Sequence, residues 1–484
     1  MVFSSAAFLF YFFPVVLALY FPVVAHKRLR NYVLLGASLF FYAWGESEYT
    51  LIMLLSILAN YFLGIWVYNE HEKGKSKTAI TAAISFNILL LVIFKYTNFI
   101  VDNLNPLLAD FGIPTIKIGA VHLPIGISFF TFHCISYIMD IYRKQTPPQR
   151  SLPNTALYIS LFPQLVAGPI IRYKDICGQL TDRYVSLERF SKGVNRFIIG
   201  LGKKVLIANV VALPADKIFN IPSEHLTTPV AWLGIFCYTL QIYFDFSGYS
   251  DMAIGLANMF GFKFMENFNY PYISRSIREF WRRWHISLST WFRDYLYIPL
   301  GGNRVGPARN YFNLFMVFFL CGLWHGASWN FIIWGLFHGA FSVIERTALG
   351  KMLERSRIVS HAYCMLVVMV AWVFFRAETF PEAFAFIKAM FGAASGSGVE
   401  WHVGLFMNAK LALVLVLGVI GVTPIIPWLK AFRDRTLARK ALGPFMADDA
   451  VEFVVSLGLM PCVFVLCAMS LASGTHNPFI YFQF

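Results

Sequence analysis

The sequence predicts an all-α protein, a single domain over residues 1–484 that crosses a membrane many times. The 484-residue chain is 58% hydrophobic and only 14% charged, whereas soluble domains carry about 25% charged residues. Apolar runs of about 20 residues recur along the whole length, and each is long enough to cross ~30 Å of hydrocarbon. Because these runs are continuous rather than alternating, they indicate helices and not the strands of an outer-membrane barrel.

The first third of the chain divides into apolar segments separated by short polar connections. We expect a polar, nearly uncharged loop between about 96 and 120. The expected helices are at 6–24, 31–44, 50–68, 79–95 and 123–142.

Two later segments depart from this simple pattern. Residues 161–175 contain two prolines and a glycine in an otherwise apolar run, which predicts a broken helix whose freed backbone groups are covered by protein or water. In residues 186–209 basic side chains are interleaved with apolar ones. That interleaving predicts a helix lying on the cytoplasmic surface of the membrane.

The basic residues predict how the chain is threaded through the membrane. Lys and Arg gather in every second connection, and the connections between these are acidic or nearly uncharged. Because basic connections stay in the cytoplasm, we expect both termini in the periplasm and an odd number of membrane helices, about eleven. The basic connections are at 27–30, 73–77, 143–150, 304–309, 346–357 and 430–440.

Composition also excludes several classes of protein. The net charge of +14 does not indicate nucleic-acid binding, because the basic residues lie in short connections rather than on one soluble face. The seven cysteines stand singly, so neither a disulfide framework nor a zinc site is predicted. The N-terminus lacks the features of a cleaved signal. We expect its first apolar run to remain as a membrane helix.

Polar side chains are densest between residues 241 and 339, where the chain carries His285, His325 and His338. Polar groups are costly to bury in so apolar a chain. The cluster therefore predicts a functional site within the membrane. No metal is predicted there, because the histidines lack a close ligand spacing such as HxxxH.

Residues 280–294, FWRRWHISLSTWFRD, are expected to form one helix. At 100° per residue, the side chains of Arg282, His285, Ser289 and Arg293 share a narrow stripe, Arg283 lies beside it, and tryptophans cover the opposite face. The pattern fits a helix at the membrane surface with snorkelling arginines. It equally fits a face that binds phosphate or substrate, and a histidine in the centre of the stripe favours this second interpretation.

His325 lies deepest of the three histidines. A helix that starts at about residue 311 places it roughly 20 Å into the bilayer. There it follows Trp324, and we expect Gly326 to leave open space beside the ring. An ionisable group at that depth predicts a functional site, and burial favours the neutral imidazole that a general base requires. The alternative is a histidine satisfied by a backbone carbonyl.

The remaining polar candidates have less specific patterns. His338 stands between glycines, so close helix packing explains it as well as chemistry does. Asp245 and Asp251 lie near Gly248, where we expect a helix break. They are predicted to orient a histidine, to bind a ligand or, as the favoured role, to pair with the arginines at 282, 283 and 293.

These motifs resemble the membrane-bound O-acyltransferase family, and most of all its members that acetylate alginate. The resemblance rests on FWRRWHISLSTWFRDYLYIPLGGN and GLWHGASWNFIIWGLFHG, with support from YFDFSGYSDMAIGL, LPIGISFFTF, FPQLVAGPIIR and FKYTNF. It implies that His325 is the catalytic histidine and His285 the second histidine of the pair. It also implies a ring of helices around a central tunnel, with the acyl donor entering from the cytoplasm.

The resemblance leads to a specific expectation of function. The chain is expected in a bacterial inner membrane, passing acetyl groups from acetyl-CoA, with no permanently bound cofactor, to a periplasmic partner with a Ser-His-Asp hydrolase-like site. Arg282 and Arg283 would attract the donor's phosphates. Relatives that act on cellulose or peptidoglycan, or that move D-alanine, leave the polymer open. A transporter of acyl groups and a non-catalytic scaffold of an export complex remain alternatives.

Overall fold

The structure is a computed structural model that describes residues 1–425, 427–429, 431 and 455–474. Helices and their connections make up all of these residues, and none of them lies in a strand, so the all-α prediction is confirmed. Four helical stretches are long and apolar enough to span a membrane, at 50–72, 76–110, 187–219 and 357–376. Shorter apolar helices accompany them. The number of about eleven spans remains a prediction.

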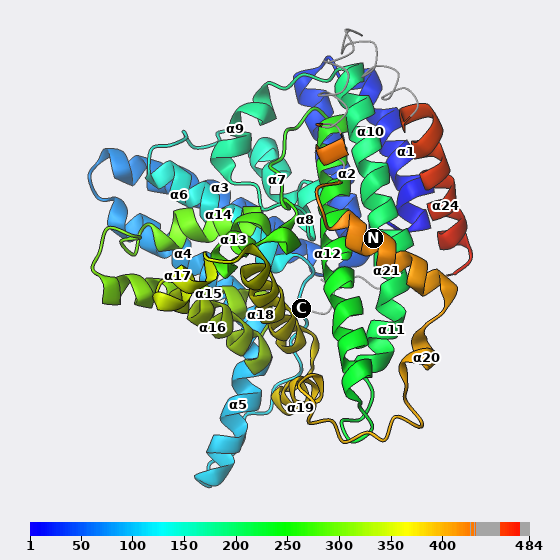
Figure 1. The fold of residues 1–484 in the computed structure, drawn as a ribbon. Coiled ribbons are helices and arrows are strands. Elements are labelled where there is room, and N and C mark those ends of the chain that lie inside the picture. The colour runs from blue at the N-terminus through cyan, green and yellow to red at the C-terminus, as the bar shows by residue number, and fades with distance from the viewer. Residues whose placement is uncertain (426, 430, 432–454, 475–484) are drawn as a thin grey trace.

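The N-terminal helices lie in two places in Figure 1: the first ones stand toward the upper right, and the α3–α4 pair lies at the left, with α5 extending below the rest. The expected loop at 96–120 is wrong for its first half, because α4 continues through a π-helical turn into another helix. The side chain of Asn98 bonds to the backbone of Val121 at 2.8 and 2.9 Å and fastens the returning chain to that helix. The elements are η1 (Phe8–Phe12), α1 (Phe13–Tyr20), η2 (Phe21–Val23), α2 (Lys27–Gly45), α3 (Thr50–Glu72), α4 (Ser76–Leu91), η3 (Val92–Tyr96) and α5 (Thr97–Asp110).

The predicted break at 161–175 is confirmed. The chain forms α6 (Ile127–Tyr142), α7 (Leu152–Ser160), α8 (Phe162–Leu165) and α9 (Tyr173–Thr181), with an irregular stretch before α9. Every residue from 161 to 171 is buried. The broken backbone is thus covered by protein, as membrane depth requires.

The surface helix expected at 186–209 is part of a longer helical stretch, and its position at the membrane surface stays a prediction. Residues 187–219 run continuously through α10 (Leu187–Gly202), η4 (Lys203–Ala208) and α11 (Asn209–Phe219), and they are long and apolar enough to cross a membrane. The basic side chains that suggested a surface helix instead find acidic partners on α12 (Thr228–Met259). Lys204 pairs with Asp245 and Lys203 with Asp251, each at 2.6 Å.

Helix α12 continues unbroken through Gly248, so the predicted break there is also wrong. The glycine serves close packing instead. A Cβ atom on Gly200 would lie 2.5 Å from the carbonyl oxygen of Gly248, and one on Gly255 would lie 2.6 Å from that of Gly193. Helices α10 and α12 therefore cross with their backbones in contact, which only glycine permits.

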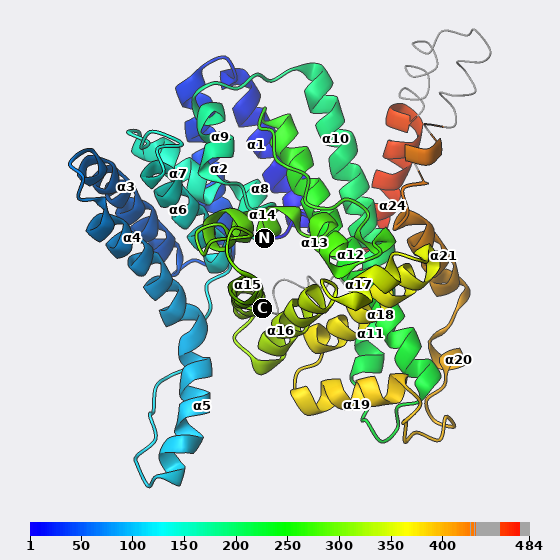
Figure 2. The ribbon, with the colours of Figure 1, turned by 60° about the vertical axis from the view of Figure 1, so that its left-hand side comes forward.

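The rest of the chain surrounds the middle of the molecule. Figure 2 shows α13 and α14 between the α3–α4 pair on one side and the α10–α12 pair on the other. The elements are η5 (Pro271–Ile273), α13 (Ile277–Arg283), α14 (Ile286–Phe292), η6 (Arg293–Tyr297), α15 (Pro307–His325), α16 (Trp329–Ile344), α17 (Ala348–Leu353), α18 (Arg357–Arg376), α19 (Phe380–Met390), α20 (Val403–Phe406), α21 (Ala409–Gly421), η7 (Val455–Leu459) and α24 (Met460–Ala472).

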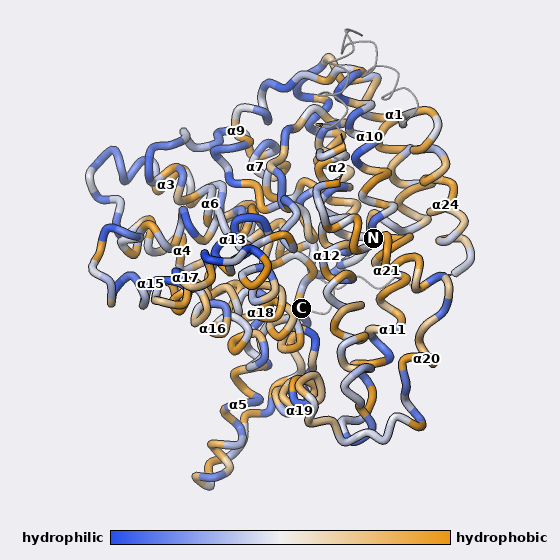
Figure 3. Tube along the Cα trace, viewed as in Figure 1, coloured by the Kyte–Doolittle hydropathy of each residue, from blue (hydrophilic) through white to orange (hydrophobic). Residues whose placement is uncertain are grey.

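Charges and apolar side chains are distributed as in a membrane protein. Helices α1, α21 and α24 are hydrophobic along most of their length (Figure 3), and Leu413, Val416 and Val465 on the last two are more than half exposed. Two of the basic connections lie together, because Lys144 pairs with Glu72 at 3.3 Å. The basic connection at 430–440, apart from residue 431, and the C-terminal ten residues lie outside the described part of the chain.

Candidate active site

The predicted helix at 280–294 is wrong, because the chain turns sharply at His285. Helix α13 ends at Arg283, α14 begins at Ile286, and His285 between them has φ +43° and ψ 55°. That left-handed conformation costs a residue with a side chain roughly 1–2 kcal/mol. Asn267 holds the turn, since its backbone oxygen accepts from the Ile286 N–H at 2.9 Å and its side-chain oxygen accepts from the Ser287 hydroxyl at 2.9 Å.

The turn also separates the side chains that were expected on one stripe. Arg282 is exposed, and Arg283 pairs with Glu279 at 2.9 Å on its own helix. The hydroxyl of Ser289 is buried without a hydrogen-bond partner in the described part of the chain. The stripe of arginine, histidine and serine that the sequence suggested is therefore not formed.

His285 is fully buried and lies near His325. Its Nδ1 lies 3.2 Å from the side-chain oxygen of Asn267, and its Nε2 has no partner in the described structure. The edge of the ring meets Phe246 of α12 at 4.6 Å between centroids. The centroids of the His285 and His325 rings are 6.5 Å apart. The structure thus brings together the two histidines that the sequence singled out.

His325 is the last residue of α15 and is 4% exposed. The 19 residues of α15 place it about 27 Å from the start of that helix, at 1.5 Å per residue. The rings of Trp324, Trp334 and Phe375 surround it at 4.9 to 5.3 Å between centroids. The open space expected beside Gly326 is absent, because a Cβ on this glycine would lie 2.1 Å from the Phe331 ring.

Two side chains that the sequence reasoning missed bind the end of α15. Lys95 donates to the carbonyl oxygens of Trp324 at 2.5 Å and His325 at 3.2 Å, and Tyr96 donates to that of Leu323 at 2.7 Å. The last carbonyls of a helix have no partner within it, so these bonds complete the helix end. A lysine inside an apolar run, as in VIFKY, is a signal that would have identified Lys95.

His338 is fully buried by aromatic rings. It stacks on Phe280 at 6.2 Å and meets Trp334 at 5.1 Å between centroids, and neither ring nitrogen has a partner in the described structure. A Cβ on Gly335 would lie 2.2 Å from the carbonyl oxygen of Phe318. The close glycine-lined packing that one interpretation of the sequence proposed is therefore present.

The two aspartates were predicted to pair with arginines, and the pairing occurs with other partners. Asp245 pairs with Lys204, and Asp251 pairs with Lys203 and Arg196, all at 2.6 Å. These ion pairs join α12 to the α10–α11 stretch. The aspartates thus hold helices together rather than orienting the histidines.

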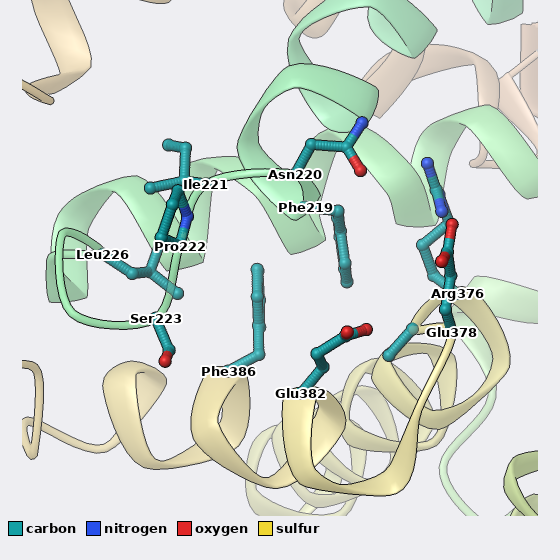
Figure 4. A pocket seen from close by; sticks show the side chains of 11 residues that line it. Phe219, Asn220, Ile221, Pro222, Ser223, Leu226, Arg376, Glu378, Glu382 and Phe386 are labelled. Carbon is teal, nitrogen blue, oxygen red and sulfur yellow. The ribbon is translucent and has the colours of Figure 1, made fainter.

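Other polar sites lie apart from the histidines. Among the described residues, no group of three or more His, Cys, Asp or Glu is arranged to hold a metal ion. Figure 4 shows a pocket where α11 and α18 end and α19 begins, lined by Arg376, Glu378 and Glu382 among others. It contains none of the predicted site residues, so the candidate active site is the histidine pair.

The arrangement suits proton transfer in a dry environment. Two imidazoles lie close together among aromatic rings, one fixed by Asn267 and the other by the end of α15. The low dielectric favours neutral imidazole, the form that accepts a proton. Such a pair can take the proton from a hydroxyl while that hydroxyl attacks a carbonyl carbon.

Comparison with known proteins agrees with this chemistry. The model of "MBOAT, membrane-bound O-acyltransferase family" matches residues 38–378. The chain is 43% identical to the probable alginate O-acetylase AlgI of Pseudomonas putida and 41% identical to that of Azotobacter vinelandii, with full coverage of both proteins in each case. It is 37% identical to the peptidoglycan O-acetyltransferase of Helicobacter pylori, over 81% of this chain and 80% of that protein. The chain therefore belongs to the membrane-bound O-acyltransferase family, as a multi-pass membrane enzyme that supports O-acylation of an exported polymer.

Proposed function

We propose that this protein transfers acetyl groups from acetyl-CoA, at the cytoplasmic face of a bacterial inner membrane, toward O-acetylation of exported alginate. The choice of alginate rests on the names of the relatives that align over the full length of the chain. The observation that carries the chemistry is the buried pair of histidines, 6.5 Å apart, in aromatic surroundings.

In this proposal His325 is the general base. The acceptor hydroxyl attacks the thioester carbonyl while its proton passes to His325, the C–S bond breaks, and the departing thiolate takes this proton from the His325 imidazolium. His285, whose Nδ1 is held by the side-chain oxygen of Asn267, positions the reactants, and nearby hydroxyls stabilise the developing oxyanion. Because the aromatic rings exclude water, hydrolysis of the thioester is limited.

The direction of transfer follows the positions of the charges. The basic connections and the exposed Arg282 would face the cytoplasm and attract the phosphates of the donor. The acetyl group would leave on the opposite side, through a tunnel past the histidines, to a periplasmic partner with a Ser-His-Asp hydrolase-like site. With this orientation both termini are periplasmic.

The direct test is His325→Ala, measured as acetylation of the polymer with the membrane level of the protein checked. We expect activity to fall about 10²–10⁴-fold, the usual contribution of a general base. His402→Ala is the matched control, since this histidine is exposed and lies outside the cluster. Wild-type acetylation by the His325→Ala variant would overturn the proposed mechanism.

Purified protein separates this proposal from its rivals. An acetyltransferase consumes acetyl-CoA when an acceptor is present, whereas a transporter or a scaffold does not. Comparing mannuronate polymers with peptidoglycan fragments as final acceptors, in the presence of the partner, tests the polymer. A preference for peptidoglycan would place the chain with its relative from Helicobacter pylori.

A further inference from the structure

Lys95 is a buried lysine in an unusual environment. It lies in the π-helical turn η3, is 7% exposed, and donates to Trp324 O, His325 O and, at 3.1 Å, Ser128 Oγ. An ammonium group has three N–H bonds, so neutral acceptors occupy all of them. Lys95 takes part in none of the ion pairs found among the described residues.

Burying a charged lysine here costs more free energy than completing a helix end would require. A buried charge without a counter-ion is strongly disfavoured, and the neighbouring carbonyl of Leu323 is satisfied by the neutral hydroxyl of Tyr96. Two features favour a cation here. The end of α15 carries partial negative charge, which attracts a cation. The residue at this end is the candidate base His325, so holding this end has a functional purpose.

We propose that Lys95 is a positioning residue for acyl transfer. It clamps the carbonyls of Trp324 and His325 to Ser128 at the start of α6, and so fixes the end of α15 and the direction of the His325 imidazole. The π-helical turn favours such a role, since these turns occur often at functional sites. The inference rests on the proposed function, in which His325 accepts the proton of the acceptor.

The test compares Lys95→Met with Tyr96→Phe in purified protein. Each variant removes one donor to the last carbonyls of α15, but only Lys95 holds the carbonyl of His325. We expect Lys95→Met to lower kcat by about 10²-fold, as a small misplacement of a reacting group does. Tyr96→Phe should change kcat only a few-fold. Acetyl-CoA should bind Lys95→Met with the wild-type Kd and stoichiometry, which shows that the protein remains folded.

Conservative and double substitutions complete the test. Lys95→Arg keeps the charge and should recover part of the lost kcat, and Lys95→Met should have no further effect in a His325→Ala background. Wild-type kcat in Lys95→Met, equal losses in Lys95→Met and Tyr96→Phe, or an additive loss in the double variant would each overturn the inference.

Two other results, a folding defect in Lys95→Met and a failure of the proposed function, can be told apart from a failure of the clamp. If Lys95→Met no longer binds acetyl-CoA, Ser128→Ala decides, because it removes one acceptor and leaves the cation in place. A lowered kcat with intact binding then supports the clamp, and a wild-type kcat overturns it. If wild-type protein fails to consume acetyl-CoA, the proposed function fails instead.

Discussion

Two regions of this molecule bury polar side chains in apolar surroundings, and they differ in how those side chains are compensated. Between α10 and α12, Lys204 and Asp245 are 3% and 2% exposed and lie 2.6 Å apart, so each charge meets its opposite. Around the histidine pair, Lys95 meets only neutral oxygens, and the Nε2 atom of His285 has no protein partner in the described residues.

This difference in compensation separates polar side chains that hold the fold together from those that serve the reaction. In a buried ion pair each charge is compensated by its partner. Such a pair joins two helices and is not available to bind a substrate. A polar group without a protein partner is available for a substrate, and a lysine held only by neutral oxygens has a cost that needs a functional reason. In this protein, the ion-paired region and the histidine region are distinguished by the partners of their polar side chains. The density of polar residues in the sequence does not distinguish them.

The largest effect that tests this comparison is expected from Asp245→Asn. This change leaves Lys204 buried without a counter-charge, which should cost ~3–5 kcal/mol and deplete folded protein. Asp245→Leu combined with Lys204→Met removes both charges and should recover most of the loss. Thermal unfolding in detergent measures the effect. If the double variant folds but loses turnover per folded molecule, the ion pair belongs to the active site and the comparison fails.

A smaller loss of stability is expected from Gly200→Ala, in the same helix crossing. The new Cβ would lie 2.5 Å from the Gly248 carbonyl oxygen, a backbone atom that cannot move aside alone. Such overpacking costs about 1–3 kcal/mol. Gly178→Ala is the matched control, because nothing lies within 4 Å of its Cβ position, and it should be neutral or slightly stabilising. Equal melting temperatures for the two variants would contradict the close crossing of α10 and α12.

Much of the fold could be predicted because it depends on local composition. The apolar runs, the break at 161–175 and the all-α class follow from residues that are neighbours in sequence. The stretch at 186–209 differs from its sequence pattern for a nonlocal reason. Lys203 and Lys204 pair with Asp251 and Asp245, about 40 residues or more away, so part of the polar face of a stretch that looks amphipathic packs against α12.

The sequence predicted the main residues of the candidate site better than it predicted their geometry. His285 and His325 are brought together as expected. The turn that aims His285 depends on Asn267, and helical periodicity cannot reveal a partner 18 residues away. Lys95 was missed because it lies far in sequence from the cluster whose backbone it holds, although a lone lysine in an apolar run marks it.

The smallest effect is expected from His338→Phe, which tests where the histidine region ends. The ring stacks on Phe280, and its two nitrogens have no partner in the described structure, so an apolar ring loses no hydrogen bond and avoids burying polar atoms. We expect turnover within a few-fold of wild type and unchanged or slightly higher thermal stability. His285→Phe provides the contrast, since it removes a ring that contacts both His325 and Asn267 and should lower turnover much further. A loss of turnover in His338→Phe equal to that in His285→Phe would extend the functional region to all three histidines.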